Sequence, residues 1–116
     1  MKRLLPQILI LTLMFHVTGC SQEKSIKLPQ PQMDGGMPLM EALSKRTTSR
    51  VFSEKELDLQ TLSNLLWAAN GINRPSDGLK TAPSAVNWQE IDIYLSLSKG
   101  VYIYNAIENQ LDFYMK

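Results

Sequence analysis

A strict alternation of apolar and polar residues late in the sequence constrains the fold most strongly. From Ile91 to Ser98 every second residue is apolar, the pattern of a strand with one buried face. Lys99-Gly100 predicts a tight turn, and the alternation resumes from Val101 to Tyr104. Asn105 to Asn109 predicts a second turn, after which Gln110 to Tyr114 can return as a third strand. These residues therefore predict an antiparallel β-meander. The residues expected to face its core are Ile91, Ile93, Leu95 and Leu97.

Two helices are expected ahead of this meander. The stronger one runs from Asp58, a natural N-cap, to Asn70, with Gly71 as its C-cap candidate. Its apolar face is formed by Leu62, Leu65, Leu66 and Ala69. Trp67 is expected in the core, with a position beside a ligand as the alternative. A shorter helix is expected over Pro38 to Ser44, with a shared apolar face of Leu39, Met40 and Leu43. The sequence therefore predicts an α+β fold.

The first twenty residues have the pattern of an export signal. A basic start is followed by an apolar run from Leu4 to Val17, which is too short for a comfortable membrane span. The end of the run, Val17-Thr18-Gly19-Cys20, resembles a bacterial lipobox. We therefore expect residues 1–20 to be a lipoprotein signal, with Cys20 lipidated and the protein held at the cell envelope, on the outer membrane or the periplasmic face. An ordinary signal peptide with an incidental cysteine is the alternative.

The next segment, residues 21–37, is polar and contains two prolines and two glycines. We interpret it as a flexible tether between membrane and domain. The alternative is a first strand around Ser25 to Leu28. The folded domain is then expected to begin at residue 38 and to continue to residue 116.

Composition excludes several kinds of site. Twelve basic and eleven acidic residues leave a net charge of +1, which argues against a general nucleic-acid binder. Cys20 is the single cysteine, so an internal disulfide and a cysteine-rich zinc site are excluded. His16, the single histidine, lies in the leader, so no metal site is expected and a histidine-based catalytic triad is ruled out.

A basic stretch rich in hydroxyl groups stands between the two expected helices. It contains Arg46, Thr47, Thr48, Ser49 and Arg50. Guanidinium and hydroxyl donors at this spacing suit a phosphate, although a solvated surface is the usual role of such a stretch. The apolar pair that follows, Val51 and Phe52, is expected to fix the segment to the domain.

A second polar stretch follows the turn-rich segment from Ile72 to Lys80. Thr81 to Gln89 combines small residues, which allow a ligand to approach the backbone, with the hydrogen-bonding groups of Ser84, Asn87 and Gln89. The alternative for this stretch is a single helical turn opened by Pro83.

Three segments in this order resemble the N-terminal half of the nitroreductase family of FMN-dependent oxidoreductases. They are Arg46 to Phe52, Leu65 to Gly71 and Thr81 to Gln89. The hairpin residues Gly100 to Tyr104 and Asn109 to Leu111 are similar to the branch that contains the SagB-type azoline dehydrogenases. Glu90-Ile91 departs from the family, in which many members have Pro-Trp.

The resemblance implies a cofactor and a set of residues that bind it. FMN phosphate and the ribityl chain are expected at Arg46, Thr48 and Arg50, with Thr47 and Ser49 in supporting contacts, and Pro83, Ser84 and Asn87 are expected at the same site. The resemblance further implies a homodimer with FMN at its interface, hydride transfer through the flavin, and a nicotinamide cofactor as a candidate electron donor. Catalytic residues are not identified.

The resemblance also bears on the extent of the fold. Family domains are longer than this chain, so we expect a partial nitroreductase-like fold, incomplete at its C-terminus, from a fragmentary or truncated chain. A non-catalytic membrane-anchored lipoprotein that serves as a scaffold is the alternative. A lipoprotein that binds peptides or sugars through Trp67, Trp88 and the tyrosines is a third hypothesis.

Overall fold

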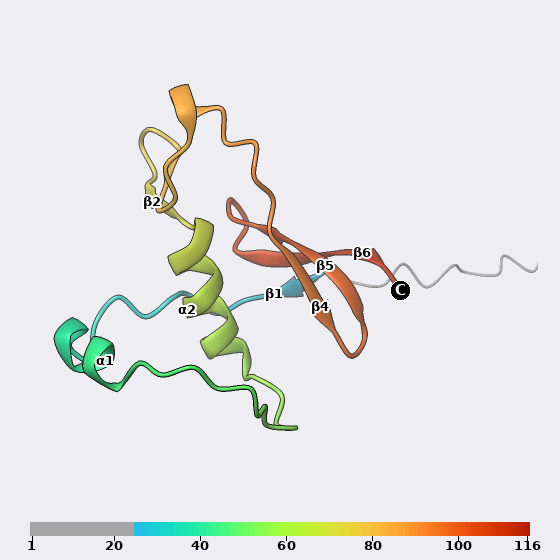
Figure 1. Ribbon diagram of the computed structural model, residues 1–116. Helices are drawn as coiled ribbons and strands as arrows, with labels where there is room; N and C mark the ends of the chain where they lie inside the picture. Colours follow the sequence, from blue (N-terminus) through green and yellow to red (C-terminus); the bar gives the residue numbers. More distant parts are fainter. Residues whose placement is uncertain (1–24) are drawn as a thin grey trace, which may run out of the picture.

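The computed structural model describes residues 25–116, so the expected export signal and Cys20 lie outside the described residues. A single long helix, α2, lies beside an antiparallel sheet (Figure 1). The elements in chain order are β1 (Ile26–Lys27), α1 (Leu39–Lys45), α2 (Leu59–Asn70), β2 (Ile72–Arg74), β3 (Leu79–Lys80), the 3₁₀ turn η1 (Ala85–Asn87), β4 (Tyr94–Leu97), β5 (Gly100–Asn105) and β6 (Gln110–Met115).

The main sheet has the strand order β1-β6-β5-β4, with every pair antiparallel. Strands β4, β5 and β6 form the predicted meander, and the predicted turns fall at Ser98-Lys99 and at residues 106–109. The first predicted strand starts later than expected, since β4 begins at Tyr94. Ile93 still binds the sheet, because its carbonyl accepts a hydrogen bond of 2.9 Å from the backbone of Tyr104.

Helix α2 forms as its capping signals predict. The Asp58 carboxylate accepts a hydrogen bond of 2.8 Å from the backbone N–H of Thr61. Leu62 and Leu66 pack into the core, whereas Leu65, which the sequence placed on the same face, is exposed. The core residues are Leu28, Leu62, Leu66, Tyr102, Tyr104 and Leu111. The α+β class predicted from the sequence is thus confirmed.

The segment that the sequence presents as a tether belongs in part to the folded domain. Ile26 and Lys27 form β1, which pairs with Leu111 and Gln110 of β6. Leu28 is 3% exposed and lies in the core. The prediction of a flexible spacer is therefore wrong for this part of the chain, and the alternative of a strand near Ser25 to Leu28 holds.

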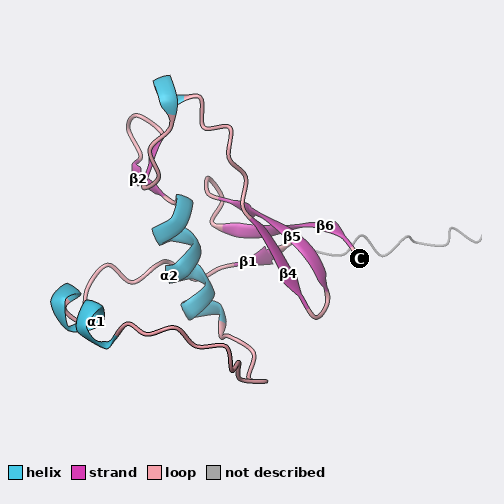
Figure 2. Ribbon diagram, viewed as in Figure 1, coloured by secondary structure: helices cyan, strands magenta, loops and turns pink. Residues whose placement is uncertain are grey.

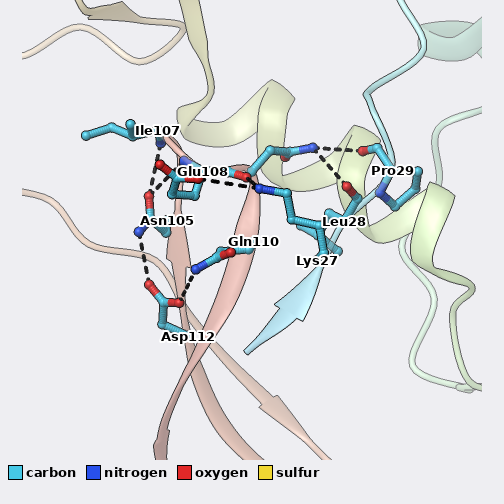
Figure 3. Close-up of polar contacts among 9 residues, drawn as sticks. Lys27, Leu28, Pro29, Asn105, Ile107, Glu108, Gln110 and Asp112 are labelled. Carbon is cyan, nitrogen blue, oxygen red and sulfur yellow. Dashed lines mark hydrogen bonds and ion pairs between the residues drawn. The ribbon is translucent and has the colours of Figure 1, made fainter. Parts of the chain in front are cut away.

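The turn between β5 and β6 holds this N-terminal segment through Asn109 and through Glu108, whose contact with Lys27 is drawn in Figure 3. Its side-chain amide donates to the carbonyl of Pro29 at 2.8 Å, and its own carbonyl accepts from the backbone of Leu28 at 3.0 Å. Lys27 adds a hydrogen bond to the carbonyl of Glu108 and an ion pair with its carboxylate at 3.5 Å. Side-chain and backbone contacts together therefore secure a strand of two residues.

The region between α1 and α2 is less packed than the sequence suggests. Helix α1 forms over the expected residues, but its apolar residues Leu39, Met40 and Leu43 are exposed. A loop runs from there to α2 (Figure 2). Val51 and Phe52 are 88% and 85% exposed, so the expectation that they fix the basic stretch to the domain is wrong within this chain.

The segment after α2 contains more regular structure than its turn signals predict. Strands β2 and β3 form a small antiparallel hairpin within Ile72 to Lys80. Gly71 closes the helix with extended backbone angles, and its N–H donates to the carbonyl of Trp67 at 2.7 Å. Trp67 is half-buried, and its indole N–H donates to the carbonyl of Ile72 at 3.3 Å. Its ring lies beside Gly71, outside the core cluster of the described residues, so the expected core position is not observed.

Candidate functional site

The basic stretch forms an exposed loop directly after α1. Arg46 is the C-terminal cap of that helix, and its backbone N–H donates to the carbonyl of Leu43 at 3.3 Å. All five candidate residues, Arg46, Thr47, Thr48, Ser49 and Arg50, are exposed. Ser49 shapes the loop locally, because its hydroxyl donates to the carbonyl of Val51 at 3.0 Å. Ser49 is thus committed to its own loop, whereas the other hydroxyls point to no partner within residues 25–116.

The three basic side chains in and beside this loop differ in whether an acidic group lies near them. The Lys45 ammonium lies 2.5 Å from the carboxylate of Glu41, one helical turn earlier. Among residues 25–116, the guanidinium groups of Arg46 and Arg50 have neither an ion pair nor a hydrogen bond. Two exposed guanidinium groups without acidic partners can bind a phosphate with charge-assisted hydrogen bonds. The loop therefore offers an anion-binding donor set.

The second candidate stretch forms a tight turn around η1. The Ser84 hydroxyl accepts a hydrogen bond of 3.0 Å from the backbone N–H of Gln89. The Gln89 side-chain amide donates to the carboxamide oxygen of Asn87 at 2.9 Å and to the carbonyl of Gly78 at 3.0 Å. The predicted residues Ser84 and Asn87 are therefore brought together, and Gln89 connects them to the β2–β3 hairpin. The helical turn after Pro83, considered as the alternative, is present.

This turn holds its polar groups with unusual backbone angles. Val86, Asn87 and Gln89 have φ values of 44°, 57° and 51°. Asparagine tolerates this left-handed region, whereas a β-branched residue such as valine rarely adopts it. Val86 is 80% exposed, so packing of its side chain does not compensate for the strain.

A small cavity of about 80 Å³ lies between this turn and the end of α2. It has room for about two or three water molecules, which is too little to enclose a flavin ring. Its polar lining includes Ser84 and Gln89, together with Asn70 and Lys80, which sequence reasoning missed. Asn70 is buried and donates to the carbonyl of Ile91 at 3.3 Å. Asn70 could have been found from the sequence, because it is a polar residue on the core face of a predicted helix. No feature of the sequence marks Lys80 as a lining residue.

Within one chain the two motifs lie apart. The turn that contains Ser84 and Asn87 borders Asn70 at the C-terminal end of α2, while the loop after α1 leads to Asp58 at its N-terminal end (Figure 1). Twelve helical residues at 1.5 Å each separate these ends by about 18 Å. A single chain therefore does not join the two motifs into one site.

The described residues also limit other kinds of site. From Ser25 to Lys116, no helix combines the length and apolar character needed to cross a membrane. In the same part of the chain, no cluster of histidine, cysteine, aspartate and glutamate side chains could hold a metal ion.

Comparison with known proteins connects these motifs to one family. The family model described as the nitroreductase family matches residues 43–113, a span that includes both candidate stretches. The fold is similar to the crystal structure of a predicted nitroreductase from Ralstonia eutropha JMP134, with 41% identity and a TM-score of 0.70. That similarity covers 80% of this chain but 44% of the other, so the chain spans less than half the length of that protein. A search of the curated proteins found no match.

Proposed function

The chain belongs to the nitroreductase family, and from this premise we propose that it serves in FMN-dependent oxidoreduction, with a small organic molecule as electron acceptor. The observation that carries the proposal is the family match over residues 43–113, which includes a basic loop whose two arginines have no other partner in the described residues. A bound flavin would supply the hydride transfer itself. The residues of this chain would bind and orient it.

The donor set of the loop fits the phosphate end of FMN. Arg46 and Arg50 supply two positive charges without competing carboxylates, and Thr47 and Thr48 supply hydroxyl donors. We propose that these residues hold the phosphate and the ribityl chain, while Ser49 keeps the loop in shape through its contact with Val51. Phosphate binding at this loop would provide affinity and position, and it would leave the redox step to the flavin.

The separation of the two motifs favours a homodimer. Because the loop after α1 and the Pro83–Asn87 turn lie apart within one chain, we propose that a second copy brings its turn to the loop of the first. Pro83, Ser84 and Asn87 would then contact the cofactor from the partner. The exposed apolar residues of α1, with Val51 and Phe52, are a surface that such a partner could cover.

Three further features belong to the proposal. Cys20 is proposed as a lipid attachment site that holds the protein at the bacterial cell envelope, on the basis of the sequence Val17-Thr18-Gly19-Cys20. The hairpin β5–β6 supports a place near the SagB-type branch of the family, because it carries the residues that resemble that branch. A nicotinamide cofactor is proposed as the electron donor.

Binding of FMN compared with riboflavin tests this proposal directly, because the two flavins differ in the phosphate. The protein, produced from its complete natural reading frame, should bind FMN and show the flavin absorbance near roughly 450 nm. Replacement of Arg46 and Arg50 by alanine should weaken FMN binding roughly tenfold to a hundredfold, since charge-assisted hydrogen bonds are lost. Riboflavin binding should change little.

Arg74→Ala is the matched control. Its guanidinium donates to the carbonyl of Lys80 at 3.2 Å, away from the loop, so FMN affinity should stay within about twofold of the unchanged protein. If no FMN binding is detected at saturating FMN concentration, the proposal is overturned and a non-catalytic scaffold is favoured. Equal losses for FMN and riboflavin would reject the phosphate role of the two arginines while leaving flavin binding in place.

A further inference from the structure

We propose that one end of the main sheet lies against the membrane surface. This hairpin end consists of the β4–β5 turn, Ser98 and Lys99, and of Tyr114, Met115 and Lys116 at the end of β6. The inference rests on the lipid attachment at Cys20 proposed above. It adds an orientation of the domain and a surface that contacts anionic lipid headgroups.

The free chain between Cys20 and the folded domain is short. A tether that extended to residue 37 would let the domain move far from the membrane. In the structure the domain begins at Ile26, so residues 21–25 alone separate it from Cys20. Six steps of extended chain, at about 3.3–3.6 Å each, allow at most about 20 Å between Cys20 and Ile26.

The beginning of the domain, around Leu28 and Pro29, is firmly held by other parts of the fold. Leu28 is buried in the core, and Asn109 contacts both Leu28 and Pro29. Ser63 of α2 donates to the same Pro29 carbonyl at 2.5 Å. Releasing this segment would expose apolar surface and leave polar groups unpaired, so the folded domain keeps its start near Ile26 and the upper limit on its distance from Cys20 holds.

The register of β1 sets the direction in which the chain enters the sheet. Strand β1 is antiparallel to β6, and Ile26 lies opposite Leu111. The chain therefore approaches Ile26 from the side on which β6 ends, at Met115. Four residues of β6 beyond Leu111 span about 13 Å, so a segment of at most about 20 Å can place Cys20 no more than about 7 Å beyond the hairpin end. Lipid at Cys20 would therefore draw this end toward the membrane.

The chemistry of the two ends of the sheet agrees with this orientation. The hairpin end carries Lys99 and Lys116, with Tyr114 and Met115 about half exposed beside them. It also includes one acidic group, because the Ser98 hydroxyl donates to the carboxylate of Glu56 at 2.8 Å. An open groove of about 610 Å³ at this end is lined in part by Ile26, Lys99 and Lys116. Lysines attract anionic headgroups, and tyrosine is favoured at membrane interfaces. At the opposite end, the β5–β6 turn, Glu108 is paired with Lys27 at 3.5 Å, so that end has no such excess of lysine.

Two single-cysteine variants of the acylated protein test the orientation. Because Cys20 is the single native cysteine and is blocked once acylated, Ser98→Cys and Ile107→Cys each provide one reactive thiol, at opposite ends of the sheet. Each variant is labelled with a fluorophore in vesicles of neutral and anionic phospholipid that contain a headgroup quencher. The label at position 98 should be quenched several-fold more than the label at position 107. Equal quenching, or stronger quenching at position 107, would overturn the proposed orientation.

A longer spacer tests the argument from chain length, and a mass measurement tests whether Cys20 carries lipid. Ten glycine and serine residues inserted between Glu23 and Lys24 should reduce the quenching at position 98 toward that at position 107. If quenching persists despite the insertion, the short spacer is not its cause and the argument from chain length fails. Absence of acyl chains on Cys20 by mass spectrometry would overturn the lipid attachment and this inference together. FMN binding, measured on the same samples, would report independently on the proposed oxidoreductase function.

Discussion

The hydroxyl of Ser63 donates a hydrogen bond of 2.5 Å to the carbonyl oxygen of Pro29, across 34 residues of sequence. Ser63 is fully buried on the face of α2 that packs against the N-terminal segment. Beside it, the Gln60 side chain donates to the carbonyl of Gln30 at 2.9 Å. Polar contacts from one helix therefore hold a segment whose composition is that of a linker.

Replacement of Ser63 by alanine should destabilise the domain. The change removes the donor and leaves the Pro29 carbonyl with fewer partners, which should lower the free energy of unfolding by about 1–3 kcal/mol. Ser44→Ala is the control, because Ser44 makes a hydrogen bond of 2.8 Å to Glu41 on the exposed helix α1. Urea unfolding should show a lower midpoint for Ser63→Ala than for Ser44→Ala. Equal midpoints would mean that the Ser63 contact contributes little.

A methyl group at position 71 should also be destabilising, through crowding. A Cβ added to Gly71 would lie 2.3 Å from the nearest ring carbon of Trp67, while the φ angle of Gly71 is an ordinary −76°. Overpacking of this kind typically costs about 1–3 kcal/mol, so Gly71→Ala should lower the thermal midpoint. Replacing Trp67 with alanine removes both the Cγ and the Cδ1 atoms that the new methyl group would meet, and in that background Gly71→Ala should cost less. An unchanged cost would point to the Trp67 backbone carbonyl, 2.6 Å away, as the obstacle.

Glycine at position 86 should stabilise the domain. Val86 has a φ of 44°, which costs a β-branched residue about 1–3 kcal/mol, and glycine adopts this angle without strain. Glycine loses more conformational entropy on folding than valine, and this cost offsets part of the relieved strain. Val86→Gly should therefore raise the free energy of unfolding by about 1 kcal/mol. Val51→Gly is the control, because Val51 is similarly exposed but its φ is not positive. If both substitutions lower the urea midpoint equally, Val86 is not strained.

The cap of α2 should make stability depend on pH in the acid range. The hydrogen bond from the backbone N–H of Thr61, at 2.8 Å, lowers the pKa of Asp58, and the Thr61 hydroxyl adds to the effect. A carboxyl whose pKa is lower in the folded state stabilises the fold above its unfolded pKa, and this contribution is lost as the pH falls through the folded value. Below a pH of about 4, stability should fall more steeply in the unchanged protein than in Asp58→Asn. Parallel pH profiles of the urea midpoint would contradict this role.

Features set by neighbouring residues could be predicted from the sequence. The alternation and the turn signal near Lys99-Gly100 specify a hairpin, because side-chain period and turn geometry are local properties. The observed strand covers only Tyr94–Leu97 of the predicted Ile91 to Ser98. Asp58 and the periodic leucines specify α2 in the same way. The donor chemistry of Arg46 and Arg50 can also be recognised locally, as can the grouping of Ser84 with Asn87.

Features set by distant partners could not be predicted in this way. Strand β1 has two residues, and their strand conformation depends on pairing with Gln110 and Leu111. Leu65 shares the helical period of Leu62 and Leu66, yet it is exposed because the sheet covers a narrower stripe of α2 than the apolar residues offer. The distance between the loop after α1 and the Pro83–Asn87 turn likewise depends on the tertiary arrangement around α2.

The pairing of β1 with β6 also has a consequence for the order of folding. Ile26 pairs with Leu111, so the loop that this contact closes contains nearly all of the described chain. The entropy of closing a loop opposes such a contact until neighbouring pairs have formed, whereas β4, β5 and β6 join through short turns and can assemble early. During synthesis Leu111 is made 85 positions after Ile26 (111 − 26). Among the strands of this sheet, β1 is therefore the first to be made and the last to pair.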